Sequence, residues 1–188
     1  MEFSFSKIFN KIKELLLTPA DFWKKHKEEE DSKMLWLTYL MPILLVLALA
    51  VFMGEFFQRT DFFIEYPLLK ALREIVLFIL TYFLGTYIST ELMKSFGAKK
   101  NADIARTLVV YSMTPLLLVS VITGLFPFLY VLDIIGLYSF YLFWVGAKEL
   151  LTFPDNKGNS YILIAIVANF FVFSFLSVLL SKLLNAYY

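Results

Sequence analysis

The sequence predicts an all-α integral membrane protein in which five transmembrane helices follow an N-terminal amphipathic helix. Its 188 residues are 60% hydrophobic and only 18% charged, whereas soluble domains are about 45–50% apolar and about 25% charged. Between Arg106 and Lys148 lie about forty positions with a single charged residue, Asp133. One helix needs about 20 apolar residues to cross the hydrocarbon core. This segment is therefore long enough for two crossings, and Gly124 and Pro127 near its middle predict the bend between them.

The composition excludes several functional classes. The formal net charge is +1, so no basic surface predicts a nucleic-acid partner. The chain has no cysteine and a single histidine, His26, and metal centres and thiol chemistry usually need these residue types. The Gly-x-Ser-x-Gly, His-Glu-x-x-His and glycine-rich phosphate-loop motifs are absent from the sequence. We therefore predict no catalytic residues, no cofactor, no metal and no enzymatic activity.

Residues 1–33 are predicted to form a cytoplasmic helical segment at the membrane interface. Between residues 3 and 17 the apolar side chains gather on one side of a helix and the charged ones on the other. Such a helix can lie in the headgroup plane, or its apolar face can pack on the protein's own membrane domain, and the sequence leaves both alternatives open. Thr18 and Pro19 mark the start of a second helix, which carries two aromatic residues of the kind that anchor at the interface. The predicted membrane-surface anchors are Phe5, Phe9, Ile12, Phe22 and Trp23.

Residues 34–188 are predicted to form the membrane domain. Its apolar stretches cover approximately residues 34–54, 71–95, 104–123, 127–147 and 161–181. Pro42 and Pro115 lie inside the first and third stretches and are expected to kink these helices, because proline lacks the N–H group that a helix needs. In the second stretch every fourth residue from Thr81 to Ser89 is small. This spacing lets transmembrane helices approach one another closely.

Lysine and arginine are distributed unevenly around these stretches. Thirteen of them flank the spans on the side of the N-terminus and four on the opposite side. In membrane proteins the cytoplasmic loops carry the excess of basic residues. We therefore predict a multi-pass protein of the cell membrane with a cytoplasmic N-terminus and an external C-terminus.

The candidate functional residues are polar residues in apolar surroundings. An ionisable residue inside a span is a functional candidate by default, but Asp133 lies only about 9 Å along an α-helix from Pro127, so an interfacial or packing role stays open. A carboxamide at Asn169 is expected to hydrogen-bond a neighbouring helix, and ligand binding is the alternative. A third span kinked at Pro115 would form a small polar cavity against the fifth. The predicted intramembrane polar site consists of Asp133, Asn169, Tyr111 and Ser112.

Short motifs in three parts of the chain carry a resemblance to a known family. The motifs are Leu-Thr-Pro19-x-x-Phe22-Trp23, Tyr111-x-x-x-Pro115 and the aromatic run from Gly136 to Gly146. With them the chain resembles the Yip family of five-span membrane proteins, which includes eukaryotic proteins that interact with Rab GTPases, and its compact length resembles the prokaryotic branch. The long acidic region with an Asp-Leu-Tyr-Gly-Pro motif of the eukaryotic members is not found in this sequence. Binding of a Rab-type GTPase is therefore in doubt.

These observations predict a non-enzymatic multi-pass membrane protein of the Yip type. Its expected partners are the lipid bilayer and either a second copy of itself or other membrane proteins. Its expected role is in membrane organisation or as a scaffold for those proteins. The alternative is a small transporter or channel-like protein that uses a polar cavity between spans three, four and five.

Overall fold

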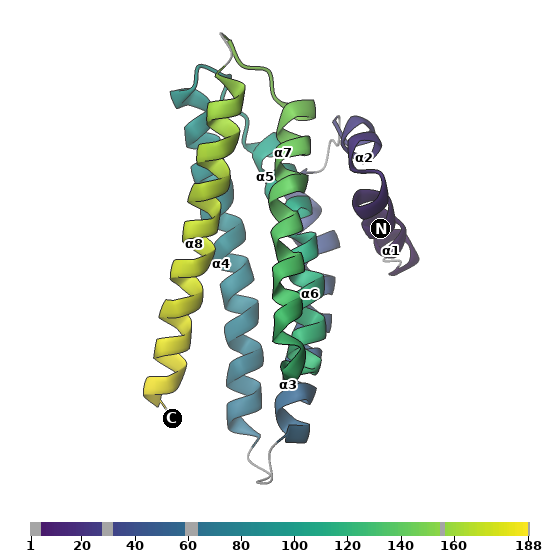
Figure 1. Cartoon of the computed structure of the whole chain (residues 1–188), viewed down its shortest axis with the longest axis vertical. Coiled ribbons are helices and arrows are strands. Elements are labelled where there is room, and N and C mark those ends of the chain that lie inside the picture. The colour runs from purple at the N-terminus through teal and green to yellow at the C-terminus, as the bar shows by residue number, and fades with distance from the viewer. Residues whose placement is uncertain (1–4, 28–31, 59–63, 155–156, 188) are drawn as a thin grey trace.

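The computed structural model describes residues 5–27, 32–58, 64–154 and 157–187, and these residues form helices and no strand. Two short helices precede five long helical rods that run along the long axis of the molecule (Figure 1). Successive rods run in alternating directions, so that each lies antiparallel to the next. The predicted all-α fold is confirmed for the described residues.

The five rods differ in how continuous they are. In chain order they consist of η1 (Ser32–Met34), η2 (Trp36–Leu40) and α3 (Met41–Gln58); α4 (Glu65–Ser95); α5 (Ala102–Ser112) and α6 (Thr114–Leu125); η3 (Pro127–Leu137) and α7 (Tyr138–Leu150); and α8 (Gly158–Tyr187). The second and fifth rods are single α-helices of 31 and 30 residues. The other three are each divided into two or more helical pieces.

Four rods of the described part are long and apolar enough to cross a membrane. They are Ser32–Gln58, Ala102–Leu125, Pro127–Leu150 and Gly158–Tyr187. The second rod, which the sequence predicts as a span over residues 71–95, is not among them. At 31 residues α4 is about 46 Å long, but it carries Lys70, Arg73 and Glu74 near one end and Glu91 and Lys94 near the other. Because α4 packs between α3 and α8, its polar residues can be satisfied by protein.

Each divided rod has a proline in or beside an irregular segment. Pro42 follows the π-helical turn η2, Pro115 lies in the first turn of α6 directly after α5 ends, and Pro127 begins the 3-10 helix η3. Proline has no N–H group to donate to the preceding turn, so the helix must change its pitch or break there. The 3-10 geometry also shifts Asp133, because a rise of about 2.0 Å per residue places it up to about 12 Å from Pro127 instead of the ~9 Å of an α-helix, with a kink at Leu129 in between.

The small-residue ladder of α4, for which the sequence predicts a close approach to another helix, lies against α8. A Cβ atom at Gly85 would overlap Oδ1 of Asn169, so glycine is needed for this approach. Asn169 Nδ2 donates to Ser89 Oγ at 3.0 Å, and the Tyr161 hydroxyl donates to the Ser89 carbonyl oxygen at 3.1 Å. Close packing therefore comes together with interhelical hydrogen bonds.

The N-terminal helices α1 (Phe5–Leu17) and α2 (Pro19–Lys25) pack on the side of the bundle, next to α7 (Figure 1). On α1, Leu15 is fully buried and Ile12 packs against the core, whereas Phe9 is 67% exposed. Of the two positions that the sequence leaves open for the apolar face of this helix, Ile12 is packed on the protein's own membrane domain. The side chain of Phe5 lies outside the described part of the structure.

The prediction that Phe22 and Trp23 face the membrane surface is wrong for this structure, because both side chains are fully buried inside the protein. The reason is a gap on α7. A Cβ atom at Gly146 would lie 2.5 Å from Trp23 Cε2 and 2.7 Å from Leu108 Cδ1, so the missing side chain makes room for the indole ring. Two adjacent aromatic residues look the same in the sequence whether they face the membrane interface or the protein interior. The space that the neighbouring helix leaves for them decides between the two.

Candidate functional site

The structure separates the four residues of the predicted polar site into two places. Ser112, Asp133 and Asn169 line one cavity of about 470 Å³. Tyr111 does not line it; this side chain is fully buried in an aromatic cluster on another side of the third rod. The neighbouring residues Tyr111 and Ser112 therefore belong to different environments.

The aromatic cluster around Tyr111 joins the N-terminal helices to the bundle. The Tyr111 ring meets Phe22 and Tyr39 edge-on, at centroid distances of 4.8 and 4.9 Å, and Trp23 at 5.9 Å. Lys11 Nζ donates to the Tyr111 hydroxyl at 2.9 Å. Such edge-to-face pairs contribute about 0.5–1.5 kcal/mol each beyond the burial of their area. The cluster thus attaches helices α1 and α2 firmly to the third rod.

Two further side chains complete the cluster. The Tyr39 hydroxyl lies 2.9 Å from Thr114 Oγ1, which ties the first rod to the third beside the break in the helix. His26 stacks on Phe22 at a centroid distance of 4.0 Å, and its Nδ1 lies 2.8 Å from the Phe22 carbonyl oxygen. The single histidine of the chain therefore has a packing role in this structure.

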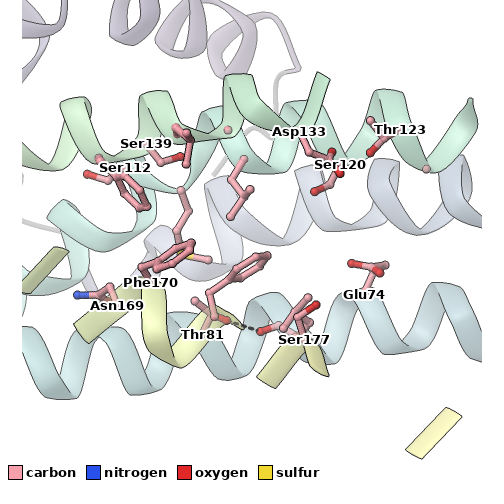
Figure 2. Close-up of a pocket in the computed structure, with 18 of the residues that line it drawn as sticks. Glu74, Thr81, Ser112, Ser120, Thr123, Asp133, Ser139, Asn169, Phe170 and Ser177 are labelled. Atoms are coloured by element: carbon pink, nitrogen blue, oxygen red, sulfur yellow. Dashed lines mark hydrogen bonds between the residues drawn. The ribbon is translucent and has the colours of Figure 1, made fainter. Parts of the chain in front are cut away.

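The cavity lies between two groups of helices (Figure 2). One wall comes from α4 and α8, and the other comes from α3, α5, α6, η3 and α7. Its volume falls within the ~300–1,000 Å³ that is usual for ligand pockets. The lining is largely apolar, with phenylalanines from α7 and α8. The polar lining side chains labelled in Figure 2 are Glu74, Thr81, Ser112, Ser120, Thr123, Asp133, Ser139, Asn169 and Ser177.

One end of the cavity is charged. The Arg73 guanidinium forms an ion pair with Glu74, and its Nη2 donates to the Ser177 carbonyl oxygen at 2.8 Å and to Ser181 Oγ at 2.7 Å. Lys70 forms an ion pair with Glu55 on α3. These contacts pair Lys70 and Arg73 and hold α4 against its two neighbours, while Arg73 Nε has no acceptor among the described residues.

Asp133 differs from the other charged residues of the lining. Its side chain is exposed, and within the described ranges it makes no hydrogen bond or ion pair. Leaving an ionised carboxylate without a partner in an apolar environment is costly. Asp133 is therefore a charged lining residue that has no protein partner within the described ranges.

The deep end of the cavity holds hydroxyl groups and an amide. Asn169 Nδ2 donates to Ser89 Oγ and to the Ala165 carbonyl oxygen at 2.8 Å, so this amide has the helix-bridging role that the sequence favours. Ser112 Oγ and Ser139 Oγ are buried, and neither has a hydrogen-bond partner among the described residues. Polar groups of this kind usually find a partner when they are buried.

The part that α4 plays in the site is not evident from the sequence. Arg73 and Glu74 lie in the first turn of the predicted second span, residues 71–95, yet both line the cavity. A signal was present, because Ser177 and Ser181 lie one turn apart on the fifth rod and can both reach one guanidinium group. In the part of the chain that the structure describes, no group of three His, Cys, Asp or Glu side chains could hold a metal ion.

Comparison with known proteins identifies the family. The profile of the Yip1 domain matches residues 13–176, a range that includes the aromatic cluster and the whole cavity lining except Ser177. Searches among curated proteins and among solved structures returned no match. The Yip1 family is not known as a family of enzymes. Since the matched range covers most of the 188 residues, the chain belongs to the Yip1 domain family.

Proposed function

We propose that this chain is a five-span Yip-type protein of the cell membrane that acts, without catalysis, in membrane organisation or as a scaffold for other membrane proteins. Residues 1–33 would form its cytoplasmic interfacial segment and residues 34–188 its membrane domain. The family match and the four apolar rods support a membrane protein of the Yip type. The excess of basic residues on the N-terminal side supports a cytoplasmic N-terminus and an external C-terminus.

The packing of α4 supports a fifth crossing. This helix lies between two rods that are long and apolar enough to span, and it runs antiparallel to both. Arg73 and Lys70, the basic residues of its first half, are both paired inside the protein. A helix that is surrounded by protein can carry more polar residues through a bilayer than one that faces lipid.

One observation supports the scaffold role most directly: the aromatic cluster packs the N-terminal helices against the bundle while their outer face stays exposed. Phe9 and Leu17 are 67% and 69% exposed, and Lys7 and Lys13 beside them are also exposed. An apolar face with flanking lysines suits the surface of the bilayer or a partner protein that is docked there. Phe22 and Trp23 are buried, so that Phe9 is the exposed one among the candidate surface anchors whose side chains the structure describes.

Photocrosslinking in native membranes tests this role. A photoreactive amino acid replaces Phe9 in the full chain, and the same amino acid at Tyr87, which is 64% exposed on α4, serves as the control. We expect the Phe9 position to label one or a few discrete proteins and the Tyr87 position to label lipid. Labelling of lipid alone at both positions would contradict the scaffold role.

The cavity supports a second candidate function, that of a small transporter or channel-like protein. The observation in its favour is a cavity of about 470 Å³ that combines charged and apolar lining residues. Flux of a solute into liposomes that contain the purified protein, lost in Asp133→Asn and in Asn169→Leu, would favour this function over the scaffold. Only a few ionisable residues line the cavity, whereas ion and proton pathways are usually built from chains of them.

A further inference from the structure

We propose that the cavity binds one phospholipid of the surrounding bilayer through a zwitterionic, amine-bearing headgroup. The headgroup ammonium would lie on Asp133, the phosphate would lie near Arg73, and one acyl chain would extend between the phenylalanines of α7 and α8. Lipid binding at this site does not depend on the scaffold role proposed above, because it uses residues on the opposite side of the third rod.

The opening of the cavity faces the hydrocarbon. Tyr130 and Leu137 on η3 and Phe170 on α8 line the cavity and are also 69%, 49% and 49% exposed. They therefore border its mouth. Both η3 and α8 belong to rods that are long and apolar enough to cross the membrane, so the space between them leads sideways into lipid. An occupant that enters there comes from the bilayer and must itself be an amphiphile.

The charged lining residues lie at one depth. Arg73 is eight residues beyond the start of α4 at Glu65, about 12 Å along an α-helix. Asp133 is six residues beyond the start of η3 at Pro127, at most about 12 Å along a 3-10 helix that is kinked at Leu129. Both elements begin at the same end of the bundle (Figure 1). The charges therefore form a layer close to one membrane interface, which is the depth of a lipid headgroup.

The charges of this layer leave one negative group unbalanced. Lys70 is paired with Glu55 and Arg73 with Glu74, so that the Asp133 carboxylate remains without a cation among the described residues. Arg73 Nε is buried and has no acceptor there. The layer thus lacks one cation and one acceptor oxygen. A phosphoethanolamine headgroup supplies both, with a primary ammonium that donates to the carboxylate and a phosphate that accepts from the guanidinium.

The rest of the lining suits an acyl chain. Beyond the charged layer the wall consists of large apolar side chains, among them Leu77, Leu116, Phe140 and Phe173. A lipid with its headgroup in the charged layer and its chain directed toward Ser112 is oriented like the other lipids of the leaflet in which α4 and η3 begin. The volume of the cavity is that of a drug-sized ligand, so we place one chain inside and leave the other in the bilayer.

Native mass spectrometry of the purified full chain tests lipid binding. The detergent-solubilised protein is titrated with phosphatidylethanolamine, phosphatidylcholine and phosphatidylglycerol that have identical acyl chains. We expect phosphatidylethanolamine to bind most tightly, and Asp133→Asn to weaken it about tenfold or more, because the ammonium then meets a neutral amide oxygen in place of a charged carboxylate. The matched control is Asp21→Asn, an exposed aspartate on α2 outside the cavity, which should leave binding unchanged.

A second pair of variants tests the place of binding. Ser120 lines the cavity, whereas Ile122 on the same helix is 43% exposed and does not line it. Ser120→Phe should abolish the lipid adducts and Ile122→Phe should preserve them, with thermal unfolding used to show that both variants fold. Equal binding of phosphatidylethanolamine and phosphatidylglycerol, or wild-type binding by Asp133→Asn, would overturn the assignment. Because Asp133→Asn changes no packing contact in the described structure, this second outcome is decisive even if Ser120→Phe fails to fold.

Discussion

The two sides of the third rod differ in how completely they are filled. On one side Tyr111 is fully buried, its ring contacts Phe22, Trp23 and Tyr39, and its hydroxyl accepts from Lys11. On the other side the next residue, Ser112, faces a cavity, and its buried hydroxyl has no partner among the described residues. A closely packed cluster contributes to stability, whereas a cavity with unpaired polar groups can bind a ligand. The adjacent residues Tyr111 and Ser112 therefore serve different purposes: Tyr111 attaches the N-terminal helices, and Ser112 lines a binding cavity.

Removing the largest side chain of the filled side should have the largest effect. Trp23→Ala leaves a cavity over Gly146 and removes contacts with Tyr111, so we expect a loss of about 3–5 kcal/mol in the free energy of unfolding. Thermal unfolding in detergent and faster proteolysis of α1 and α2 measure it. The control Phe9→Ala, at an exposed position, should stay within about 0.5 kcal/mol. Equal losses for the two variants would show that the cluster does not attach these helices.

The second largest loss of stability is expected when the charged wall of the cavity is changed. Arg73→Gln removes the ion pair with Glu74 and weakens the contacts that join α4 to α8 through Ser177 and Ser181. The pair is largely shielded from solvent, so breaking it should cost up to about 3 kcal/mol, and chemical unfolding followed by circular dichroism measures the loss. Lys100→Gln breaks an ion pair with Glu91 that is half exposed, so it should cost less than about 1 kcal/mol. A reversed order would mean that Arg73 does not hold the two helices together.

A smaller effect is expected when the filled side loses only a hydroxyl group. Tyr111→Phe preserves the ring contacts and removes the acceptor of Lys11 Nζ. One hydrogen bond of this kind contributes about 1 kcal/mol, so the midpoint of thermal unfolding should fall by a few degrees. An unchanged midpoint would place the stabilisation of the cluster in its ring contacts alone.

The smallest effect on stability is expected on the cavity side of the third rod, at Ser112. Ser112→Ala removes a buried hydroxyl that has no protein partner in the described structure, so the free energy of unfolding should change by less than about 0.5 kcal/mol or increase slightly. Measured beside Tyr111→Phe in the same detergent, it compares the two sides directly. A loss as large as that of Tyr111→Phe would show that the Ser112 hydroxyl has a partner, and that this side is filled as well.

Much of the fold could be predicted from apolar stretches and helix breakers. The apolar stretches of the first, third, fourth and fifth rods correspond to the four membrane-length helices, and Pro115 lies where the third rod divides. The second stretch was harder to classify as a membrane span, because α4 combines charged ends with a small-residue ladder. Whether such a helix spans depends on what surrounds it, and hydropathy counts only the helix itself.

The candidate site was less predictable for a related reason. Ser112, Asn169 and Asp133 were recognisable as polar residues in apolar stretches, and all three line one cavity. Arg73 and Glu74 lie in the first turn of the predicted second span, yet they belong to the charged layer of the cavity. Polarity marks a residue as exceptional, but it does not reveal which residues of other helices it meets.

The sequence by itself determined the helical class, the apolar rods and the positions where they break, because these properties depend on transfer to hydrocarbon and on the missing N–H of proline. Only the tertiary structure decided the direction in which each side chain points. Phe22 and Trp23 are buried because Gly146 on α7 leaves space for them, and Tyr111 and Ser112 point apart because successive residues of a helix are about 100° apart around its axis. Neighbours in the chain can therefore have opposite roles, since packing follows the geometry of the bundle.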